Sequence, residues 1–322
     1  MAIVGAGALA LAAGGAGTLR AEEFFSTRDQ NELLRGFYLP LPSDTRLDAG
    51  ATLNATLMIS NTLNVEERGR ESLLVDGESD VLDLTLDHAL SSSWRYRFTL
   101  PLIRDSGGFL DSVIDTWHEA FGFSRGNRPY FPKGLIDYDY SGIANNGEKI
   151  RIDMNHRETS VGDVAADLGW YALDDARWTV SLWEGLKAPT GSVADLTSDG
   201  AWDGAFWAHA ALRGTLWQFA AEAGVVQPFG DELFEGDAHR HSVFARCAAT
   251  RAVGSAWSLR AQLDGQTGRV AGSELRYLGP TLQLTVGAVR KLGAKWRIEM
   301  GFAEDAAVNT APDITFFLGI HD

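Results

Sequence analysis

The sequence predicts an all-β fold, namely a transmembrane, antiparallel, up-and-down β-barrel of about twelve strands with one helix-bearing extracellular loop. The first observation is a spacing: five tryptophans follow one another at intervals of 84, 39, 40 and 39 residues, so a beat of about 40 is kept or doubled. The second is that each tryptophan follows a short polar or glycine-bearing turn and opens a strand-like run. The third is the alternation of apolar and polar residues in these runs. The tryptophans are Trp94, Trp178, Trp217, Trp257 and Trp296.

The alternation places each tryptophan in an apolar row. Successive side chains of a strand point to opposite faces, so residues two apart share a face. After Trp94 one face is apolar and the other is charged or polar, with Tyr96, Phe98, Leu100 and Leu102 opposite Arg95, Arg97 and Thr99. The other four runs repeat this arrangement. Aromatic residues fixed at one level of an apolar surface are expected at a membrane boundary, here as a periplasmic aromatic girdle.

Twelve runs of this kind can be counted, and roughly ten residues is the length that crosses a bilayer at a tilt. An even number places both termini on the periplasmic side, so the turns before the tryptophans are the short periplasmic ones. The segments 66–72, 105–160, 188–202, 227–241, 266–280 and 305–312 then become extracellular loops. The predicted strands are 51–65, 73–90, 94–104, 161–173, 177–187, 203–213, 216–226, 242–253, 257–265, 281–292, 296–304 and 313–321.

The chain divides into a signal peptide at 1–21, a periplasmic arm at 22–50 and the barrel at 51–322. Residues 1–21 form an apolar run of small residues that ends in alanine, as secretory signals do; a membrane anchor is the alternative. The formal charge of −15 disfavours nucleic acid as a partner. The single cysteine, Cys247, allows no internal disulfide. We expect the outer membrane of a Gram-negative bacterium, with its lipid and its barrel-assembly machinery as partners.

Two other folds share part of the pattern. A β-propeller also repeats at about 40 residues, but its blades use four short strands each and the chain has no Trp-Asp signature. A soluble lipocalin-like barrel would turn the apolar rows inward around a cavity, and alternation alone does not tell inside from outside. The signal peptide, the level of the tryptophans and the number of strands favour the membrane barrel.

Residues 105–160 depart from the repeat. Apolar residues at helical spacing predict a helix over 109–121, and its stripe either packs as a loop cover or gates the pore mouth. Asp111, Asp115 and His118 on the opposite face are a divalent-cation site or a solvated surface. Residues 136–140 and 149–154 predict a β-hairpin. The candidate gate residues are Phe109, Leu110, Val113, Ile114, Trp117 and Phe121.

The polar rows of the strands carry both signs of charge. In the narrow lumen of a twelve-stranded barrel such charges either pair as a structural network or line a path that selects a polar solute. The predicted lumen-lining residues are Arg95, Arg97, Asp163, Asp167, His209, Arg213, Glu222, Arg246, Arg260, Asp264, Arg297 and Glu299.

An outer-leaflet lipid-modifying enzyme is the alternative from another class. It needs a nucleophile beside a histidine, and His239, His241 and Ser242 are the nearest candidates. Their spacing matches no established motif, and the chain has no phosphate loop and no Gly-x-Ser-x-Gly. We therefore predict no catalytic, cofactor-binding or metal-binding residues.

Four stretches resemble an uncharacterised proteobacterial outer-membrane family, domain-of-unknown-function family 3187. They are Arg28-Asp29-Gln30-Asn31, Ser106-Gly107-Gly108-Phe109-Leu110-Asp111-Ser112, Val161-Gly162-Asp163-Val164 and Ala311-Pro312-Asp313-Ile314-Thr315-Phe316. The resemblance spans most of the mature chain and implies an outer-membrane barrel without assigned activity. The ending Ile320-His321-Asp322 departs from the usual aromatic C-terminal residue.

These observations predict a passive channel or transporter for a small polar solute. The alternatives are the lipid-modifying enzyme and a structural or surface-interaction barrel with a closed lumen.

Overall fold

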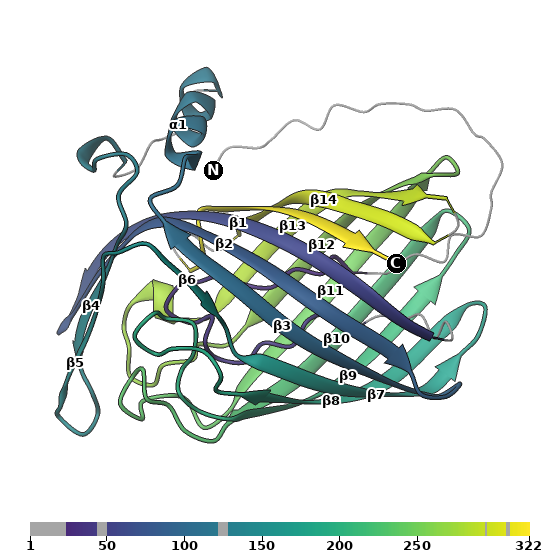
Figure 1. Ribbon diagram of the computed structural model, residues 1–322, viewed down its shortest axis with the longest axis horizontal. Helices are drawn as coiled ribbons and strands as arrows, with labels where there is room; N and C mark the ends of the chain where they lie inside the picture. The colour runs from purple at the N-terminus through teal and green to yellow at the C-terminus, as the bar shows by residue number, and fades with distance from the viewer. Residues whose placement is uncertain (1–23, 44–49, 122–127, 294, 307–309) are drawn as a thin grey trace.

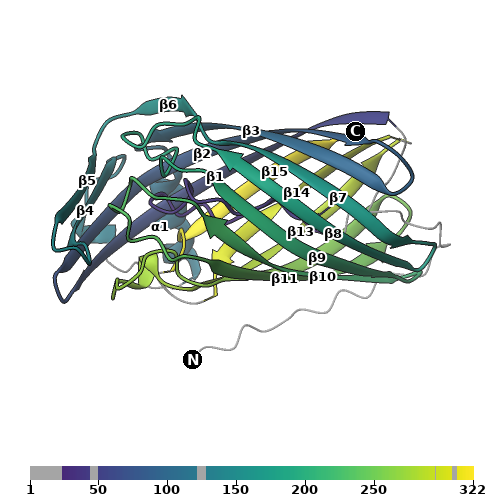
Figure 2. The ribbon, with the colours of Figure 1, turned by 90° about the horizontal axis from the view of Figure 1, so that it is seen from below.

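The computed structural model describes residues 24–43, 50–121, 128–293, 295–306 and 310–322, without the side chains of residues 117, 118, 120 and 121. The predicted signal peptide, 1–21, lies outside these residues. The described chain forms a closed antiparallel barrel (Figures 1 and 2), which confirms the predicted fold class. Strand β15 pairs with β1 from Ala55 opposite Ile320 to Asn61 opposite Ile314, and this pairing closes the ring.

Twelve strands make the wall, and each pairs with its neighbours along the chain. They are β1 (Gly50–Arg68), β2 (Glu71–Ala89), β3 (Trp94–Ser106), β7 (Val164–Asp174), β8 (Trp178–Ala188), β9 (Asp203–Arg213), β10 (Trp217–Pro228), β11 (Ser242–Val253), β12 (Trp257–Gln266), β13 (Thr281–Leu292), β14 (Trp296–Asp305) and β15 (Ile314–His321). These bounds agree with the twelve predicted runs to within a few residues.

The apolar rows face outward. On β12, Trp257 and Leu259 are 38% and 54% exposed, whereas Ser258 and Arg260 between them are 2% exposed. The same alternation runs along β8 to β15. A soluble barrel with an apolar cavity would show the reverse, so the lipocalin-like alternative is wrong.

The five predicted girdle tryptophans are the first residues of β3, β8, β10, β12 and β14, and each is between 38% and 48% exposed. These strands all start from the same end of the barrel, which we call the tryptophan end. Gly254 and Gly293 in the preceding turns have φ of +77° and +71°, a backbone conformation that glycine adopts at little cost. The opposite end carries the longer connections, and we call it the loop end.

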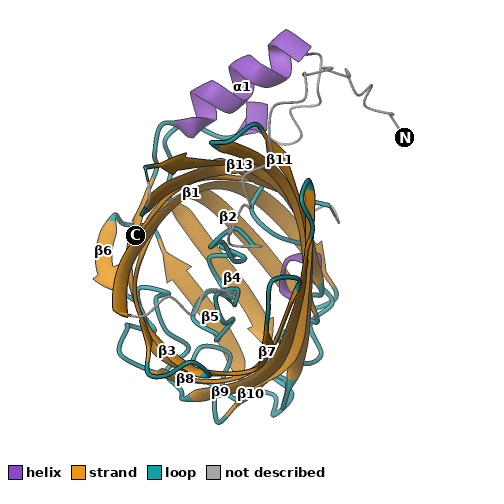
Figure 3. Ribbon diagram, turned by 90° about the vertical axis from the view of Figure 1, so that its right-hand side faces the viewer, coloured by secondary structure: helices purple, strands orange, loops and turns teal. Residues whose placement is uncertain are grey.

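At the loop end two additions extend the wall. Strands β1 and β2 continue to a turn at Gly69-Arg70, so most of the predicted loop 66–72 is strand. The predicted hairpin is confirmed as β4 (Asp137–Ile143) and β5 (Lys149–Met154), and β4 pairs with Ser72 to Asp76 of β2. The short β6 (Glu158–Val161) pairs with β3. Seen from the tryptophan end, β4 and β5 stand behind the ring of strands (Figure 3).

Residues 24–43 lie inside the barrel, where we expected a periplasmic arm (Figure 1). We call them the inserted segment. Phe24 packs against Ala211 and Ala220, nearer the tryptophan end, and Leu33 packs in a cluster at the loop end. Ser43 lies near the start of β1 again, beside a small cavity that Phe24 also lines. The segment therefore enters and returns on the same side. Its dense apolar residues explain this, because a solvated arm would leave them in water.

A hydrophobic cluster closes the loop end. The inserted segment, the extended β2, the β4–β5 hairpin and the long connections each contribute buried side chains to it. Its largest members include Phe37, Tyr138, Tyr140, Phe234 and Tyr277. Tyr277 belongs to the 3-10 helix η2 (Arg276–Leu278). This end of the barrel is thus packed like the interior of a soluble domain.

Helix α1 (Leu110–Phe121) lies outside the ring of strands (Figure 3), and the short η1 (Arg128–Tyr130) follows it. Leu110 and Ile114 are buried, while Phe109 before the helix and Val113 within it are 63% and 50% exposed. Among the described residues, no helix is both long enough and apolar enough to cross a membrane.

Candidate functional site

The lumen-facing charges bind the main chain of the inserted segment. This segment has little regular secondary structure, so its N–H and C=O groups need partners from elsewhere once they are buried. Acidic and amide side chains of the wall accept from its N–H groups: Phe25 N donates to Gln262 at 2.7 Å, Ser26 N to Glu299 at 2.9 Å, Tyr38 N to Asp203 at 2.8 Å and Ser43 N to Glu222 at 3.1 Å.

Basic side chains of the wall, and Arg269 of the connection between β12 and β13, satisfy the carbonyl oxygens in the same way. Lys187 donates to Gly36 O at 2.7 Å, Arg269 to Tyr38 O at 3.0 Å, Arg246 to Pro40 O at 2.7 Å and Arg97 to Pro42 O at 2.7 Å. Together the two sets of bonds form a charged cradle for an irregular backbone. Charge-assisted hydrogen bonds of this kind are stronger than neutral ones.

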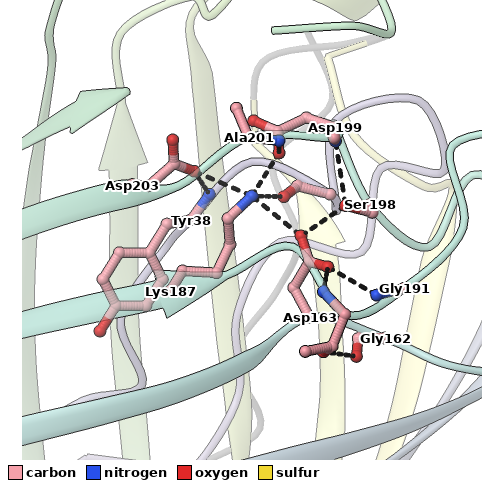
Figure 4. A network of polar contacts seen from close by, with 12 residues as sticks. Tyr38, Gly162, Asp163, Lys187, Gly191, Ser198, Asp199, Ala201 and Asp203 are labelled. Atoms are coloured by element: carbon pink, nitrogen blue, oxygen red, sulfur yellow. Dashed lines mark hydrogen bonds and ion pairs between the residues drawn. The ribbon is translucent and has the colours of Figure 1, made fainter. Parts of the chain in front are cut away.

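Lys187 is the centre of one cluster (Figure 4). Its ammonium lies 2.9 Å from Asp163 and 3.1 Å from Asp203, and it also pairs with Asp199. Asp163 in turn accepts from the backbone of the 189–202 connection, at Thr190 N and Gly191 N. Lys187 on β8 thereby links the inserted segment to β9 and to a connection at the loop end.

Two arginines of the inserted segment pair with carboxylates of the wall. Arg28 lies 2.8 Å from Asp83, and Arg35 lies 2.5 Å from Asp105. The Arg35 side chain is 4% exposed and also donates to Ser79 at 2.6 Å. Buried pairs of this kind fix geometry, because loss of one partner leaves an uncompensated charge.

A second cluster is formed by side chains of β9 to β12. Arg246 pairs with Glu222 at 2.5 Å and with Asp264 at 3.0 Å, and Nδ1 of His209 lies 3.7 Å from Glu222. The ring of Phe24 meets the His209 imidazole edge to face at 5.8 Å. This cluster thus contacts the start of the inserted segment through Phe24 and its end through Pro40 and Ser43.

The third cluster surrounds Glu299. This carboxylate lies 3.2 Å from His321 and 3.8 Å from Arg260, and the Arg260 guanidinium stands 4.7 Å from the centroid of the Phe25 ring. Arg297 is buried nearby on the same strand. The penultimate residue of the chain therefore belongs to the lumen network.

Two acids of the inserted segment are buried at its turn. Burial raises the pKa of Glu32 to about 7, although hydrogen bonds from Tyr277 and Thr62 oppose the shift. Burial likewise raises the pKa of Asp29 to about 6, opposed by bonds from the Asn31 backbone and Gln266. Burial thus raises the pKa of both carboxyls above its ordinary value while the segment stays inside.

Ten of the twelve predicted lumen residues face the interior and are buried or nearly so: Arg95, Arg97, Asp167, His209, Glu222, Arg246, Arg260, Asp264, Arg297 and Glu299. Asp163 lies between β6 and β7 in the Lys187 cluster. Arg213 differs, because it sits at the tryptophan end and pairs with the partly exposed Asp174 at 3.2 Å.

The predicted gate helix does not lie over the pore mouth. Helix α1 stands beside the ring rather than over it, and the side chains of Trp117 and Phe121 lie outside the described ones. Asp111 pairs with Arg128 at 3.1 Å and Asp115 with Lys133 at 2.7 Å, so basic side chains already occupy two of the proposed cation ligands.

The residues considered for catalysis are not assembled. Ser242 is 2% exposed and accepts a hydrogen bond from Arg269, whereas His239 and His241 are exposed. Among the described side chains, no hydrogen bond joins Ser242 to either histidine. A nucleophile and its base must be within hydrogen-bond reach.

Sequence reasoning missed the inserted segment as part of the site. Eight apolar or aromatic residues, Phe24, Phe25, Leu33, Leu34, Phe37, Tyr38, Leu39 and Leu41, fall within a stretch of 18 positions. So many apolar residues are unusual in a solvated arm, and their density could have predicted that this segment is buried. The residual space beside the segment is small, since cavities of about 20, 20 and 10 Å³ remain between it and the wall. Each holds about one water molecule.

The family described as "Protein of unknown function (DUF3187)" matches residues 23–321. No curated protein matches the chain in sequence. The COG4313 outer membrane channel from Pseudomonas putida F1 is similar in structure, with a TM-score of 0.57 and 17% identity over 87% of this chain and 98% of that one.

Two further barrels are less similar. The Pseudomonas putida toluene transporter TodX has a TM-score of 0.39 and 12% identity, over 85% of this chain and 90% of its own. The β-domain of the Bordetella autotransporter BrkA has a TM-score of 0.44 and 12% identity, over 85% and 99%. Of these three, the Pseudomonas putida F1 channel alone exceeds a TM-score of 0.5, and it shows a shared barrel fold.

Proposed function

The chain belongs to the family described as protein of unknown function (DUF3187), and from that premise we propose that it is a passive outer-membrane channel for a small polar solute, gated by residues 24–43. The observation that carries the proposal is the charged cradle. This wall holds an irregular segment by its main chain through polar and charged side chains, as Lys187, Arg246 and Asp203 show. Water can replace such contacts when the segment leaves.

Release of the inserted segment would expose a lumen of mixed charge. Lys187, Arg97 and Arg246 would lose their carbonyl partners, and Asp203 and Glu222 their N–H donors. Such a lining favours polar solutes over apolar ones. In this proposal lipid contacts the outward apolar rows, the assembly machinery reads β15, and no residue has a catalytic role.

Conductance in planar bilayers tests the gate. The wild-type chain should open briefly and rarely, and deletion of 24–43 should give stable open channels. A reversible lock avoids relying on the deletion alone. In a Cys247→Ser background, Arg28→Cys and Asp83→Cys, whose parent side chains lie 2.8 Å apart, are joined by a reducible bifunctional thiol reagent.

The locked protein should not conduct until the reagent is reduced. Absence of conductance from the wild type, the deletion and the reduced variant together would refute the channel. Equal conductance of locked and reduced protein would refute the gate while leaving the channel intact. Removal of residues 110–121 is a useful comparison and should leave conductance unchanged, because α1 lies outside the ring.

A further inference from the structure

The outer surface of the wall carries one charge at an unexpected place. Glu184 on β8 belongs to the outward row with Trp178, Val180, Leu182 and Leu186, and it is exposed. It lies six residues along the strand from Trp178, roughly 15 Å along the barrel axis for a tilted strand. The apolar band of such barrels is about 25 Å tall, so this carboxylate lies well inside it.

The other outward charges lie near the ends of their strands or are paired, as Asp80 in the middle of β2 is with Arg104 at 3.8 Å. Arg251 and Arg290 stand over Trp217 and Trp257 at the tryptophan end. Arg104 and Glu304 are one or two residues from the loop-end limits of β3 and β14. Glu184 has apolar neighbours instead, since Leu168 and Phe206 are its cross-strand partners. Within the described residues, no hydrogen bond or ion pair engages its carboxylate.

Glu184 lines a groove of about 680 Å³ on this outer surface. Apolar side chains form its sides, among them Phe98, Leu186, Phe206 and Val225, while Ala166 and Gly204 leave its floor low. A Cβ added at Gly204 would lie 3.4 Å from the Phe229 ring and 3.9 Å from Gly185 O, so the site has room for a side chain that it lacks. The volume is that of a small-molecule site.

We propose that this groove binds a membrane-dissolved amphiphilic amine, with its ammonium on the Glu184 carboxylate and its hydrocarbon part against the apolar sides. A carboxylate surrounded by hydrocarbon is costly unless a cation or a proton neutralises it. Arg97 also borders the groove, but it is 5% exposed and pairs with Asp87 on the lumen side. Among the described residues no outward-facing cation neutralises Glu184, and the groove is open to the lipid. The charge therefore selects an amine over a fatty acid or a neutral hydrocarbon of the same length. This site is separate from the lumen and does not depend on the channel proposal.

Electron paramagnetic resonance of the full chain in nanodiscs tests the site, with a spin-labelled alkylamine as the probe and the spin-labelled fatty acid and alkanol of equal length as comparisons. The alkylamine should show a motionally restricted population that the other two probes lack. Glu184→Gln should weaken alkylamine binding by at least about tenfold. Gly204→Leu, which fills the groove, should remove the restricted population.

Two matched variants serve as controls. Ala261→Leu places a leucine of the same size on the outward face of β12, away from the groove, and should leave binding unchanged. In Glu184→Gln combined with Leu263→Glu, the carboxylate stands at equal depth, six residues from Trp257, and should not restore binding. Circular dichroism verifies that each variant is folded.

Equal restriction of the alkylamine by the wild type and Glu184→Gln would overturn the proposal. So would equal restriction of the amine and the alkanol, which would mean a groove for neutral apolar molecules. Recovery of binding by the relocated carboxylate would equally overturn it, because charge at that depth would then suffice without the groove.

Discussion

Lys187 on β8 donates from Nζ to the main-chain oxygen of Gly36 at 2.7 Å, so a cation of the wall holds the inserted segment by its backbone. Gly36 in turn lies against the 189–202 connection so closely that a Cβ there would stand 2.6 Å from the carbonyl carbon of Ser198. The Lys187 ammonium and the lack of a side chain at Gly36 thus fix the position of this part of the inserted segment. They make the position of the segment testable by single substitutions.

Lys187→Met should destabilise the folded protein by about 3–5 kcal/mol, because a buried charge group loses its cation. Asp163, Asp199 and Asp203 would remain without an ammonium, and the Gly36 carbonyl would lose its donor. Urea unfolding in detergent measures the free energy. Proteolysis within 24–43 should also become faster than in the wild type.

Lys149→Met on the exposed side of β5 is the control and should change neither measurement. Unaltered proteolysis in Lys187→Met would mean that the lysine does not hold the segment.

Gly36→Ala should unseat the inserted segment, because its Cβ has no room beside Ser198. We expect more frequent channel opening with the barrel itself intact. Gly265→Ala is the matched control, since the nearest atoms to its Cβ lie at 3.6 Å or beyond and should accommodate it. Identical single-channel records from the two variants would contradict the close packing of Gly36 against Ser198.

The inserted segment should be held less tightly as the pH rises from about 4.5 towards 7. The pKa of Glu32 is raised from 4.5 to about 7, chiefly by burial, so the inserted form retains a proton that the released form loses. Stability of insertion is therefore full below the ordinary pKa of the group and declines until the pH passes its raised value. Asp29 shifts in the same direction.

Release as a function of pH is measured by thiol labelling of Phe37→Cys in the Cys247→Ser background. The rate at each pH is divided by that of the same cysteine in the unfolded protein, because the reactive thiolate fraction itself rises with pH. Labelling should speed up across this window in the parent protein. Glu32→Gln, which is uncharged at every pH, should flatten much of the dependence. A labelling rate that is equally steep in both would assign the effect to other groups.

The girdle tryptophans should report the membrane boundary in reconstituted protein. A variant that retains only Trp257, which is 38% exposed on the outer surface, should be quenched by lipids brominated near the glycerol backbone. A variant that retains only Trp183, which is 1% exposed and stacked on Trp207 at 5.8 Å inside the barrel, should be quenched far less. Equal quenching would contradict the outward facing of the tryptophan row.

The lumen shows how far sequence reasoning reaches. Alternation placed Arg97, Glu222 and Arg246 on the inward rows, because the side-chain period of a strand is fixed by its backbone. Their partners were not predictable in this way. Arg97 donates to Pro42 O and Arg246 to Pro40 O, contacts across 55 and 206 positions of the chain. No local period links positions so far apart.

Helix α1 illustrates the same limit. Its apolar spacing predicted a helix over 109–121, and the structure has one at Leu110–Phe121. Spacing does not say which surface the stripe meets, and the contacts of Asp111 with Arg128 and Asn61 place the helix beside the wall.

Short stretches of the sequence were enough to predict the local features: twelve strands, their apolar and polar faces, the level of the tryptophans and the even number of strands. Each follows from the two-residue period of a strand and from the turn signals between successive strands, which are local properties of the chain. What fills the barrel depends on contacts between distant parts of the chain. Residues 24–43 lie inside because the closed wall offers their apolar side chains a core and their irregular backbone a ring of charged partners. That complementarity exists only once distant strands are side by side.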